Sequence, residues 1–179
     1  MKKSILLALA LICCVTAFAQ KGERLGLKGL NVGVGAPVEF YDLKAVGANL
    51  HVGFDCTYSI SDKFALGFYL SAGGGALFEL HPQYQYDKVF SMFKFSAGLL
   101  MEIGELDKKP FLVGIGPGTG VGFLDMDLIL PVEIRFGRLF SNHWYVMGEI
   151  DYGYSLAEET ISVEPVIRIG YNFGHSRKR

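Results

Sequence analysis

Alternation of side-chain type along short segments is the feature that most limits what this chain can fold into. In the segment ISVEPVIRIGYNF (residues 161–173), the odd positions carry apolar side chains or proline, whereas the even positions include Ser162, Glu164, Arg168 and Asn172. A period of two places successive residues on opposite faces of a β-strand. The segment therefore predicts a strand with one apolar face and one polar face.

The same alternation recurs in eight segments along the chain. Most of these segments are long enough for a tilted strand that crosses a membrane, which needs about 9–11 residues. No segment shows the pattern of an amphipathic helix, and a slip of one residue would move every side chain to the other face. The segments are residues 30–36, 48–58, 64–74, 89–103, 111–123, 128–140, 144–156 and 161–173.

The residue types on the two faces indicate which face is confined. The apolar face is bulky, whereas the other face is rich in glycine, as at Gly114, Gly116 and Gly118, with charged residues interspersed. A soluble barrel or sandwich would enclose its bulky residues instead, and an eight-stranded barrel has an interior just wide enough for side chains. The sequence therefore predicts an all-β fold, an eight-stranded antiparallel transmembrane up-and-down β-barrel. Its apolar face meets lipid, and closure leaves no unpaired strand edge in hydrocarbon.

Three prolines lie inside the expected strands. Proline has no backbone N–H to donate to a neighbouring strand. We therefore expect Pro165 to mark a bulge or a loosened rim, and the same disturbance at Pro117 and Pro131.

The N-terminal segment MKKSILLALALICCVTAFAQ resembles a cleavable secretory signal. It has two lysines, a short apolar stretch and the sequence Ala-Phe-Ala before Gln20, which predicts a cleavage site at Ala19 and Gln20. The alternative is an anchor that stays attached, but the apolar stretch is short for a membrane span. We expect residues 1–20 to be the signal peptide, residues 21–173 the barrel domain and residues 174–179 a short basic tail.

The spacing between strands predicts how the barrel is oriented. Short links at residues 59–63, 104–109 and 141–143 alternate with longer ones at residues 37–47 and 75–88. Bacterial barrels place short turns in the periplasm, so both termini are expected to be periplasmic. Aromatic residues gather at the short-turn end, as an interfacial girdle would. The expected girdle comprises Tyr58, Phe64, Phe111, Phe140, Trp144, Tyr171 and Phe173.

With these features the sequence resembles the small outer-membrane β-barrel proteins of the OmpA/OmpX-like kind, and the outer membrane protein beta-barrel domain group. The resemblance rests on the signal peptide, the alternating strands, the segment VGIGPGTGVGF and the terminal IGYNF. It implies residence in the bacterial outer membrane after secretory export. It also implies that the terminal aromatic is recognised by the outer-membrane assembly machinery, although here the tail GHSRKR follows it. Outer-membrane lipid, including lipopolysaccharide, is the other expected partner.

Charged residues on the confined face are the candidate site. They either line a narrow ion path, because charged rings set pore selectivity, or form a buried ion-pair network that fills the barrel, which eight strands favour. Acids outnumber bases, so at least one carboxyl should be protonated, solvated or ion-bound. The set comprises Asp55, Lys94, Glu102, Glu133, Arg135, Glu149, Asp151, Glu164 and Arg168.

Three weaker candidate sites come from the outer half of the expected barrel. A His/Ser/acid set of the kind used by lipid A-modifying barrels could include His51, Ser155, Ser162 and Glu164, but it matches no family motif. Loop acids could hold calcium, although they are more often merely solvated, and outer aromatic residues could form an adhesive surface or belong to an outer girdle. The acids are Asp125, Asp127, Glu158 and Glu159, and the loop residues are Phe78, His81, Tyr84 and Tyr86.

These observations predict a non-enzymatic protein with a structural or surface-interaction role in the envelope. The alternatives are a small porin-like channel for ions or solutes and, third, an outer-leaflet lipid-modifying enzyme. We expect no cofactor and no metal. The chain also lacks a basic excess for nucleic acid, since 17 Lys and Arg face 18 Asp and Glu even before Lys2 and Lys3 are removed. Neither the ligand of the outer loops nor the oligomeric state is encoded in a recognisable motif.

Overall fold

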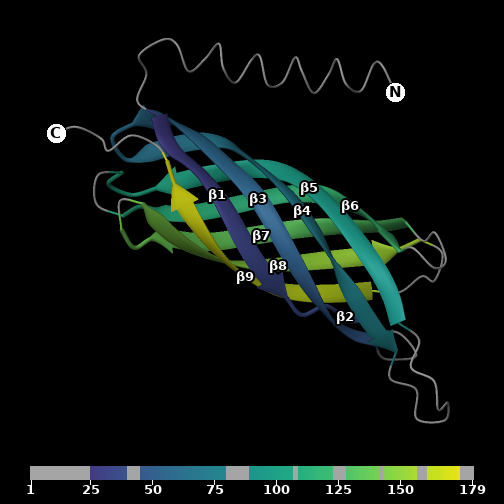
Figure 1. The fold of residues 1–179 in the computed structure, drawn as a ribbon. Helices are drawn as coiled ribbons and strands as arrows, with labels where there is room; N and C mark the ends of the chain where they lie inside the picture. The colour runs from purple at the N-terminus through teal and green to yellow at the C-terminus, as the bar shows by residue number, and fades with distance from the viewer. Residues whose placement is uncertain are drawn as a thin grey trace, which may run out of the picture.

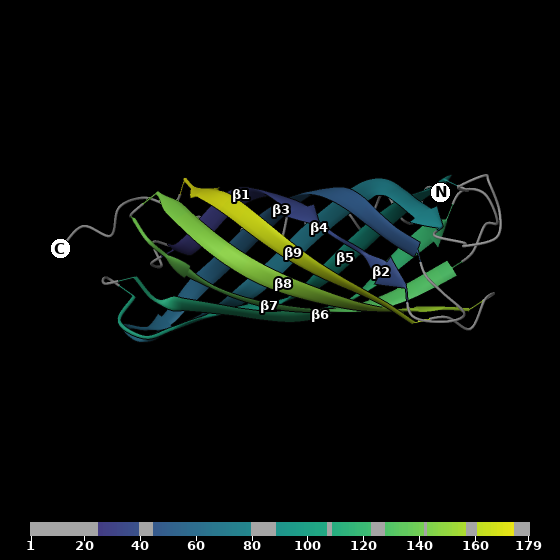
Figure 2. The same cartoon turned by 90° about the horizontal axis from the view of Figure 1, so that it is seen from below.

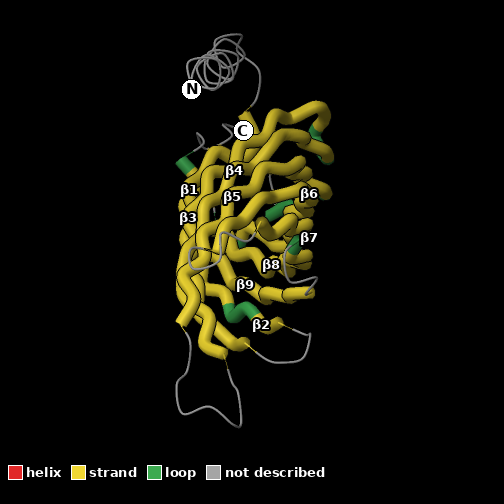
Figure 3. Tube along the Cα trace, turned by 90° about the vertical axis from the view of Figure 1, so that its right-hand side faces the viewer, coloured by secondary structure: helices red, strands yellow, loops and turns green. Residues whose placement is uncertain are grey.

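The computed structural model describes residues 25–39, 45–79, 89–106, 109–122, 128–141, 143–156 and 161–173. These residues form antiparallel strands that wind around one elongated barrel (Figure 1). Strands make up nearly all of the described trace, and the described loops are short (Figure 3). Within these ranges no helix is both long and apolar enough to cross a membrane.

The strands follow one another around the barrel in an up-and-down order. Their bounds are β1 Leu25–Gly35, β2 Val38–Glu39, β3 Ala45–Ser61, β4 Phe64–Glu79, β5 Val89–Ile103, β6 Phe111–Gly122, β7 Leu128–Leu139, β8 Trp144–Ser155 and β9 Ile161–Asn172. The short segment β2 continues β1, because Val38 pairs with Val46 of β3 and with Val163 of β9, the same two neighbours that β1 has. The described barrel therefore has eight strands, as the sequence predicted.

Pairing of the first strand with the last closes the barrel. Antiparallel partners run from Gly29↔Asn172 to Gly35↔Val166, and β9 lies beside β1 in both views (Figures 1 and 2). The other side of β1 pairs with β3. Each described strand thus has a neighbour on both sides, which satisfies the backbone groups that hydrocarbon could not.

The two faces of each strand separate as the alternation predicted. In β9 the even positions are buried, and all the odd positions except the half-buried Val163 are exposed. Ile167 and Ile169 are 64% and 50% exposed, whereas Arg168 between them is 0% exposed. The exposed face is apolar and wide, which is the arrangement that a bilayer stabilises. The protein core therefore lies in the lumen of the barrel.

Several expected strand boundaries are wrong. The strand expected at residues 48–58 is β3, Ala45–Ser61, which is three residues longer at each end. The first strand begins at Leu25 instead of Leu30, and β4 runs to Glu79, so residues 75–79 belong to a strand and not to an outer loop. The strand extension is held by pairs on both sides, such as Ala45↔Glu79 and Phe78↔Val89. Three consecutive glycines at 73–75 conceal the alternation, which resumes beyond them with Leu77 buried and Phe78 exposed.

The prolines interrupt pairing without shifting the register. Partners Gly35↔Val166 and Val38↔Val163 lie on either side of Pro165 in one continuous register, so no bulge forms there. The break lies opposite Pro165 at residues 36–37, where Pro37 also lacks an N–H. The amide of Ala36 still donates to the carbonyl of Pro165 at 3.1 Å. Pro117 and Pro131 likewise have in-register partners, Val132 and Gly153.

The start of β1 and the end of β9 lie at the same end of the barrel, which is also where the short turns are (Figure 1). Six of the seven aromatic residues of the expected girdle lie at or next to strand ends here, and Tyr58 lies three residues before the end of β3. Three of them pack together, with Tyr171 5.1 Å from Trp144 and 5.6 Å from Phe173 between ring centroids. Arg138 lies over the ring of Phe111 at 4.9 Å. Their function as a membrane-interface belt stays a prediction.

A charge on the outward face should lower the stability of the barrel by an amount that depends on its depth in the bilayer. Ile134 lies in the middle of β7, is 51% exposed and has the outward-facing Ile115 and Ile150 as cross-strand partners. The substitution Ile134→Lys should lower the free energy of unfolding by about 2–4 kcal/mol, which is the cost of a lysine near the bilayer midplane. Denaturant unfolding in lipid vesicles, followed by the fluorescence of the single tryptophan, Trp144, measures this change.

The control is Ile60→Lys, which places the same charge next to the turn at residues 62–63. Ile60 is 64% exposed, so it is at least as accessible as Ile134. Near the interface the cost should fall to about 0–1 kcal/mol. Equal costs at the two positions would contradict a membrane-spanning wall.

Candidate functional site: the charged lumen

All nine charged residues that the sequence placed on the confined face are buried. None is more than 3% exposed. The residues come from β3 and β5 on one side and from β7, β8 and β9 on the other. A side chain lining even a water-wide channel would keep some accessible surface, so this layer of the lumen is filled.

Glu149 on β8 is the centre of the network. Arg168 donates to both of its carboxylate oxygens, from Nε at 2.8 Å and from Nη2 at 2.6 Å. Nε of Arg135 forms an ion pair with the same carboxylate. One acid therefore holds two guanidinium groups, and the bidentate pair with Arg168 also fixes the orientation of that guanidinium group.

The two arginines extend the network to other strands. Arg168 on β9 donates to Asn31 of β1 at 3.0 Å and to Ser71 of β4 at 2.9 Å. Arg135 on β7 donates to Glu133 at 2.9 Å, and its guanidinium lies 3.6 Å above the centre of the Tyr69 ring. These contacts cross the interior and tie several strands to one another.

Asp55 on β3 receives donors from two further strands. Nδ2 of Asn31 donates to it at 2.6 Å and the hydroxyl of Tyr145 at 2.5 Å. The Tyr145 ring fits because β1 and β9 carry glycines beside it. A Cβ at Gly29 would lie 2.7 Å from the Tyr145 hydroxyl, and one at Gly170 would overlap the ring.

A second group of charges surrounds Glu164 on β9. Lys94 of β5, four positions away around the eight-stranded wall, forms an ion pair and hydrogen bond with it. His51 Nε2 lies 2.8 Å from the carboxylate, and Asn49 donates to it at 2.9 Å. Lys94 also lies 3.7 Å from Asp151, which is too long for a hydrogen bond.

Glu102 lies toward the short-turn end, apart from the other acids. It accepts a hydrogen bond from the backbone N–H of Leu27 at 2.7 Å and another from the hydroxyl of Thr57. A register shift between Leu25 and Lys28 in β1 places residues 26–27 opposite Thr57. Glu102 therefore satisfies a backbone group that the shifted pairing leaves without a strand partner.

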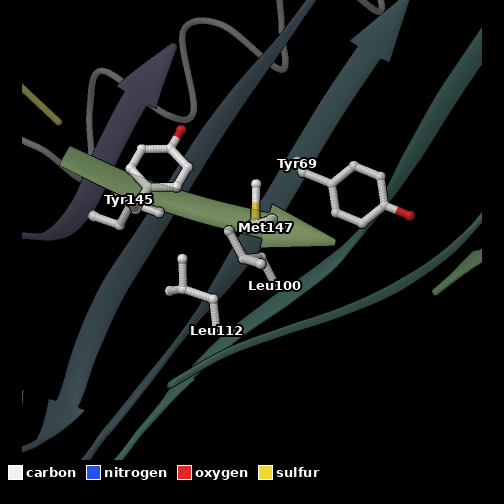
Figure 4. Packing of buried hydrophobic residues seen from close by; sticks show 6 residues of the cluster. Tyr69, Leu100, Leu112, Tyr145 and Met147 are labelled. Atoms are coloured by element: carbon white, nitrogen blue, oxygen red, sulfur yellow. The ribbon is translucent and has the colours of Figure 1, made fainter. Parts of the chain in front are cut away.

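Apolar layers flank the charged layer, and the sequence analysis missed most of them. Toward the short-turn end, Tyr69, Leu100, Leu112, Tyr145 and Met147 converge on one another inside the wall (Figure 4), together with Leu27. Toward the other end, Leu77, Met92 and Ile129 form a second buried cluster. The signal was present in the sequence, because these residues share the alternation of the luminal acids, as Met147 does with Glu149.

The structure brings together two of the four residues in the expected His/Ser/acid set. His51 contacts Glu164, but its other ring nitrogen, Nδ1, faces Gly73, where a Cβ would lie 2.5 Å away. His51 and Ser162 are 2% and 8% exposed, so neither is open to a substrate. The side chain of Ser155 is outside the described residues. Among the described members of the set, His51 is bonded to Glu164, and no hydrogen bond joins it to Ser162.

Several expected features lie outside the described residues. They are the cleavage site at Ala19 and Gln20, the tail at residues 174–179, the acids Asp125, Asp127, Glu158 and Glu159, and the loop residues His81, Tyr84 and Tyr86. Phe78, the fourth member of that loop set, belongs to β4 instead and is 43% exposed.

Comparisons with known proteins identify the fold. No protein-family model matches the chain, and none of the curated proteins matches it in sequence. Similar solved structures include Ail, the attachment invasion locus protein of Yersinia pestis, solved with the heparin analogue sucrose octasulfate. It is 12% identical with a TM-score of 0.57, and the match covers 83% of this chain and 99% of Ail.

Two other barrels are similar to the same degree. Neisserial surface protein A is 12% identical with a TM-score of 0.54, over 82% of this chain and 97% of that one. The outer membrane enzyme PagL is 15% identical with a TM-score of 0.52, over 76% and 97%. Adhesion-related, surface and enzymatic proteins thus share one architecture. The chain therefore has the fold of the small eight-stranded outer-membrane β-barrel proteins.

Proposed function

We propose that this chain is an integral outer-membrane β-barrel protein with a structural or surface-interaction role in the bacterial envelope, and that it acts neither as an enzyme nor as a channel. The observation that carries the proposal is the filled charged layer. Lys94 and Glu164 pair across opposite walls, and the luminal charged residues are at most 3% exposed. Ion pairs across the lumen are suited to hold the barrel wall rigid. Conduction instead needs an open path with sites that bind ions weakly.

The proposed setting is supported by the fold and by the positions of the first and last described strands. The short turns and both ends of the described barrel would face the periplasm, with the long links outside. Secretory export and recognition of the terminal strand by the assembly machinery would deliver the protein there. Lipopolysaccharide and other outer-membrane lipid would then surround the apolar wall, and surface partners would bind the outer links.

Conductance separates the proposed role from a pore. The refolded protein in a planar bilayer should show no steady current steps, because Arg135 and Arg168 occupy the layer through which ions would pass. Heat-dependent gel mobility first establishes that the barrel has closed. Steady ion-selective steps that change in Arg135→Gln or Lys94→Gln would assign a channel function instead.

Lipid chemistry separates the proposed role from an enzyme. We expect cells that express the protein to keep an unchanged pattern of lipid A acylation, measured by mass spectrometry of extracted lipid. A change that disappears in His51→Ala would overturn the non-enzymatic proposal, since His51 is the base of the expected His/Ser/acid set and contacts its acid, Glu164.

Stability measurements test whether the network holds the barrel together. Glu149→Gln removes the carboxylate that pairs with Arg135 and Arg168 and leaves two buried cations without their shared partner. Breaking a buried pair in this way should lower the free energy of unfolding by about 3–5 kcal/mol. Denaturant unfolding of the refolded barrel in vesicles gives the value.

The matched control is Glu105→Gln, the same change at an exposed position in the turn after β5. Surface substitutions of this kind alter stability by about 0.5 kcal/mol or less. If the two variants lose the same small amount, the luminal charges do not stabilise the wall.

A further inference from the structure

Three carboxylates lie in a row across three neighbouring strands of the lumen. Glu133 of β7 is the cross-strand partner of Asp151 of β8, and Asp151 is the partner of Glu164 of β9. Like charges directly opposite one another in a sheet are destabilising. Glu149, two residues before Asp151 on the same face, adds a fourth acid. This row needs a positive charge close to its centre.

Asp151 is the member of the row that the protein itself does not satisfy. It is 1% exposed, and neither of its carboxylate oxygens accepts a hydrogen bond within the described structure. Lys94 is its only described ion-pair partner, at 3.7 Å, and the same ammonium group is bonded to Glu164. A buried carboxylate in this condition is costly unless something else binds it.

The charge balance of the lumen also indicates that a further positive charge is needed. Among the described residues, six buried carboxylates face three permanent cations, Lys94, Arg135 and Arg168. Even with His51 protonated, two negative charges remain, which is the charge that one divalent cation would balance. Asp151 belongs to both groups of described acids and histidine whose ligand atoms lie close enough together to share one ion.

We infer that the lumen binds one divalent cation of the calcium class, with Asp151 as its central ligand and carboxylate oxygens of Glu133 and Glu149 beside it. The ligand atoms of these three residues all lie within 4.8 Å of one another. Two oxygens bound to one calcium ion at about 2.3–2.6 Å each can be about 4.6–5.2 Å apart, so the spacing of these atoms is compatible with one shared ion. Ligands that are all oxygen suit a hard cation.

Histidine offers a competing set on the other side of Asp151. Ligand atoms of His51, Asp151 and Glu164 also lie within 4.8 Å of one another. A nitrogen ligand would favour zinc over calcium. Cations already contact both sets, because Lys94 pairs with Glu164 while Arg135 pairs with Glu133 and Glu149 and Arg168 pairs with Glu149. The set on the β7 side is preferred because all of its ligands are oxygen, the ligand type that calcium binds. The site would stabilise the barrel whether or not the lumen conducts, so it does not depend on the proposed role.

The experiment compares barrels refolded with EDTA, with calcium chloride or with magnesium chloride. Calcium should raise the temperature at which the wild-type barrel unfolds on heat-dependent gel mobility, and magnesium should raise it less. Calorimetric titration of the EDTA-refolded protein should give one calcium per barrel. Asp151→Asn should abolish the calcium shift and, in EDTA, unfold at a higher temperature than the wild type, because it removes the repelled charge.

Two control variants and one substitute variant keep the test specific. Glu102→Gln removes a buried luminal acid outside the row and should keep the calcium shift. A double Asp125→Asn and Asp127→Asn variant should also keep it, which separates the luminal site from the outer acids. If Asp151→Asn does not refold, Glu133→Gln should bind calcium at least tenfold more weakly than the wild type.

Three results would overturn the inference. One is identical unfolding of wild type and Asp151→Asn with and without calcium, which would mean that a proton neutralises Asp151. Another is a calcium shift that survives Asp151→Asn or disappears in the outer-acid variant. The third is tighter binding of zinc chloride than of calcium with loss of binding in His51→Ala, which would assign the histidine-containing set.

Discussion

A strand that crosses hydrocarbon has no water to satisfy its backbone, and this constraint determines the rest of the structure. Pairing between β1 and β9 removes the two edges that an open sheet would leave. Once the sheet is closed, each strand has one face toward lipid and one toward the lumen. The strict alternation of the sequence is the direct result, because no strand can exchange its faces without exposing charge to lipid.

Closure with eight strands also limits what the lumen can contain. The interior admits side chains but little else, so each large residue requires a small one opposite. Tyr145 occupies the space that Gly29 and Gly170 leave. Charged residues in such a space must find partners in one another, and Glu149 does so for two arginines. The result is a charged layer between two apolar layers.

The sequence was sufficient for the eight-stranded fold and for the two faces of each strand, because the faces depend only on whether a residue is odd or even in its strand. The nine charged residues that it placed inward are buried. The sequence was not sufficient for the contacts. Lys94 forms an ion pair with Glu164 because closure of the barrel sets the position of β5 relative to β9 along the barrel axis. Alternation of side chains carries no information about this axial position. The apolar layers were not predicted for a different reason. Leu100 and Met147 lie on the luminal face, but an apolar side chain is expected on the lipid face. Glycines concealed the end of β4.

The β1–β9 contact has a consequence for how the barrel can form. It joins residues as far apart as Lys28 and Asn172, which are 144 positions apart and are linked by a hydrogen bond. Contacts between such distant segments slow folding, because a long loop must be ordered before they form. Until the last strand arrives, β1 and the growing sheet present unpaired edges to any other chain nearby. A nascent chain of this kind therefore requires protection from aggregation until its final strand has been delivered.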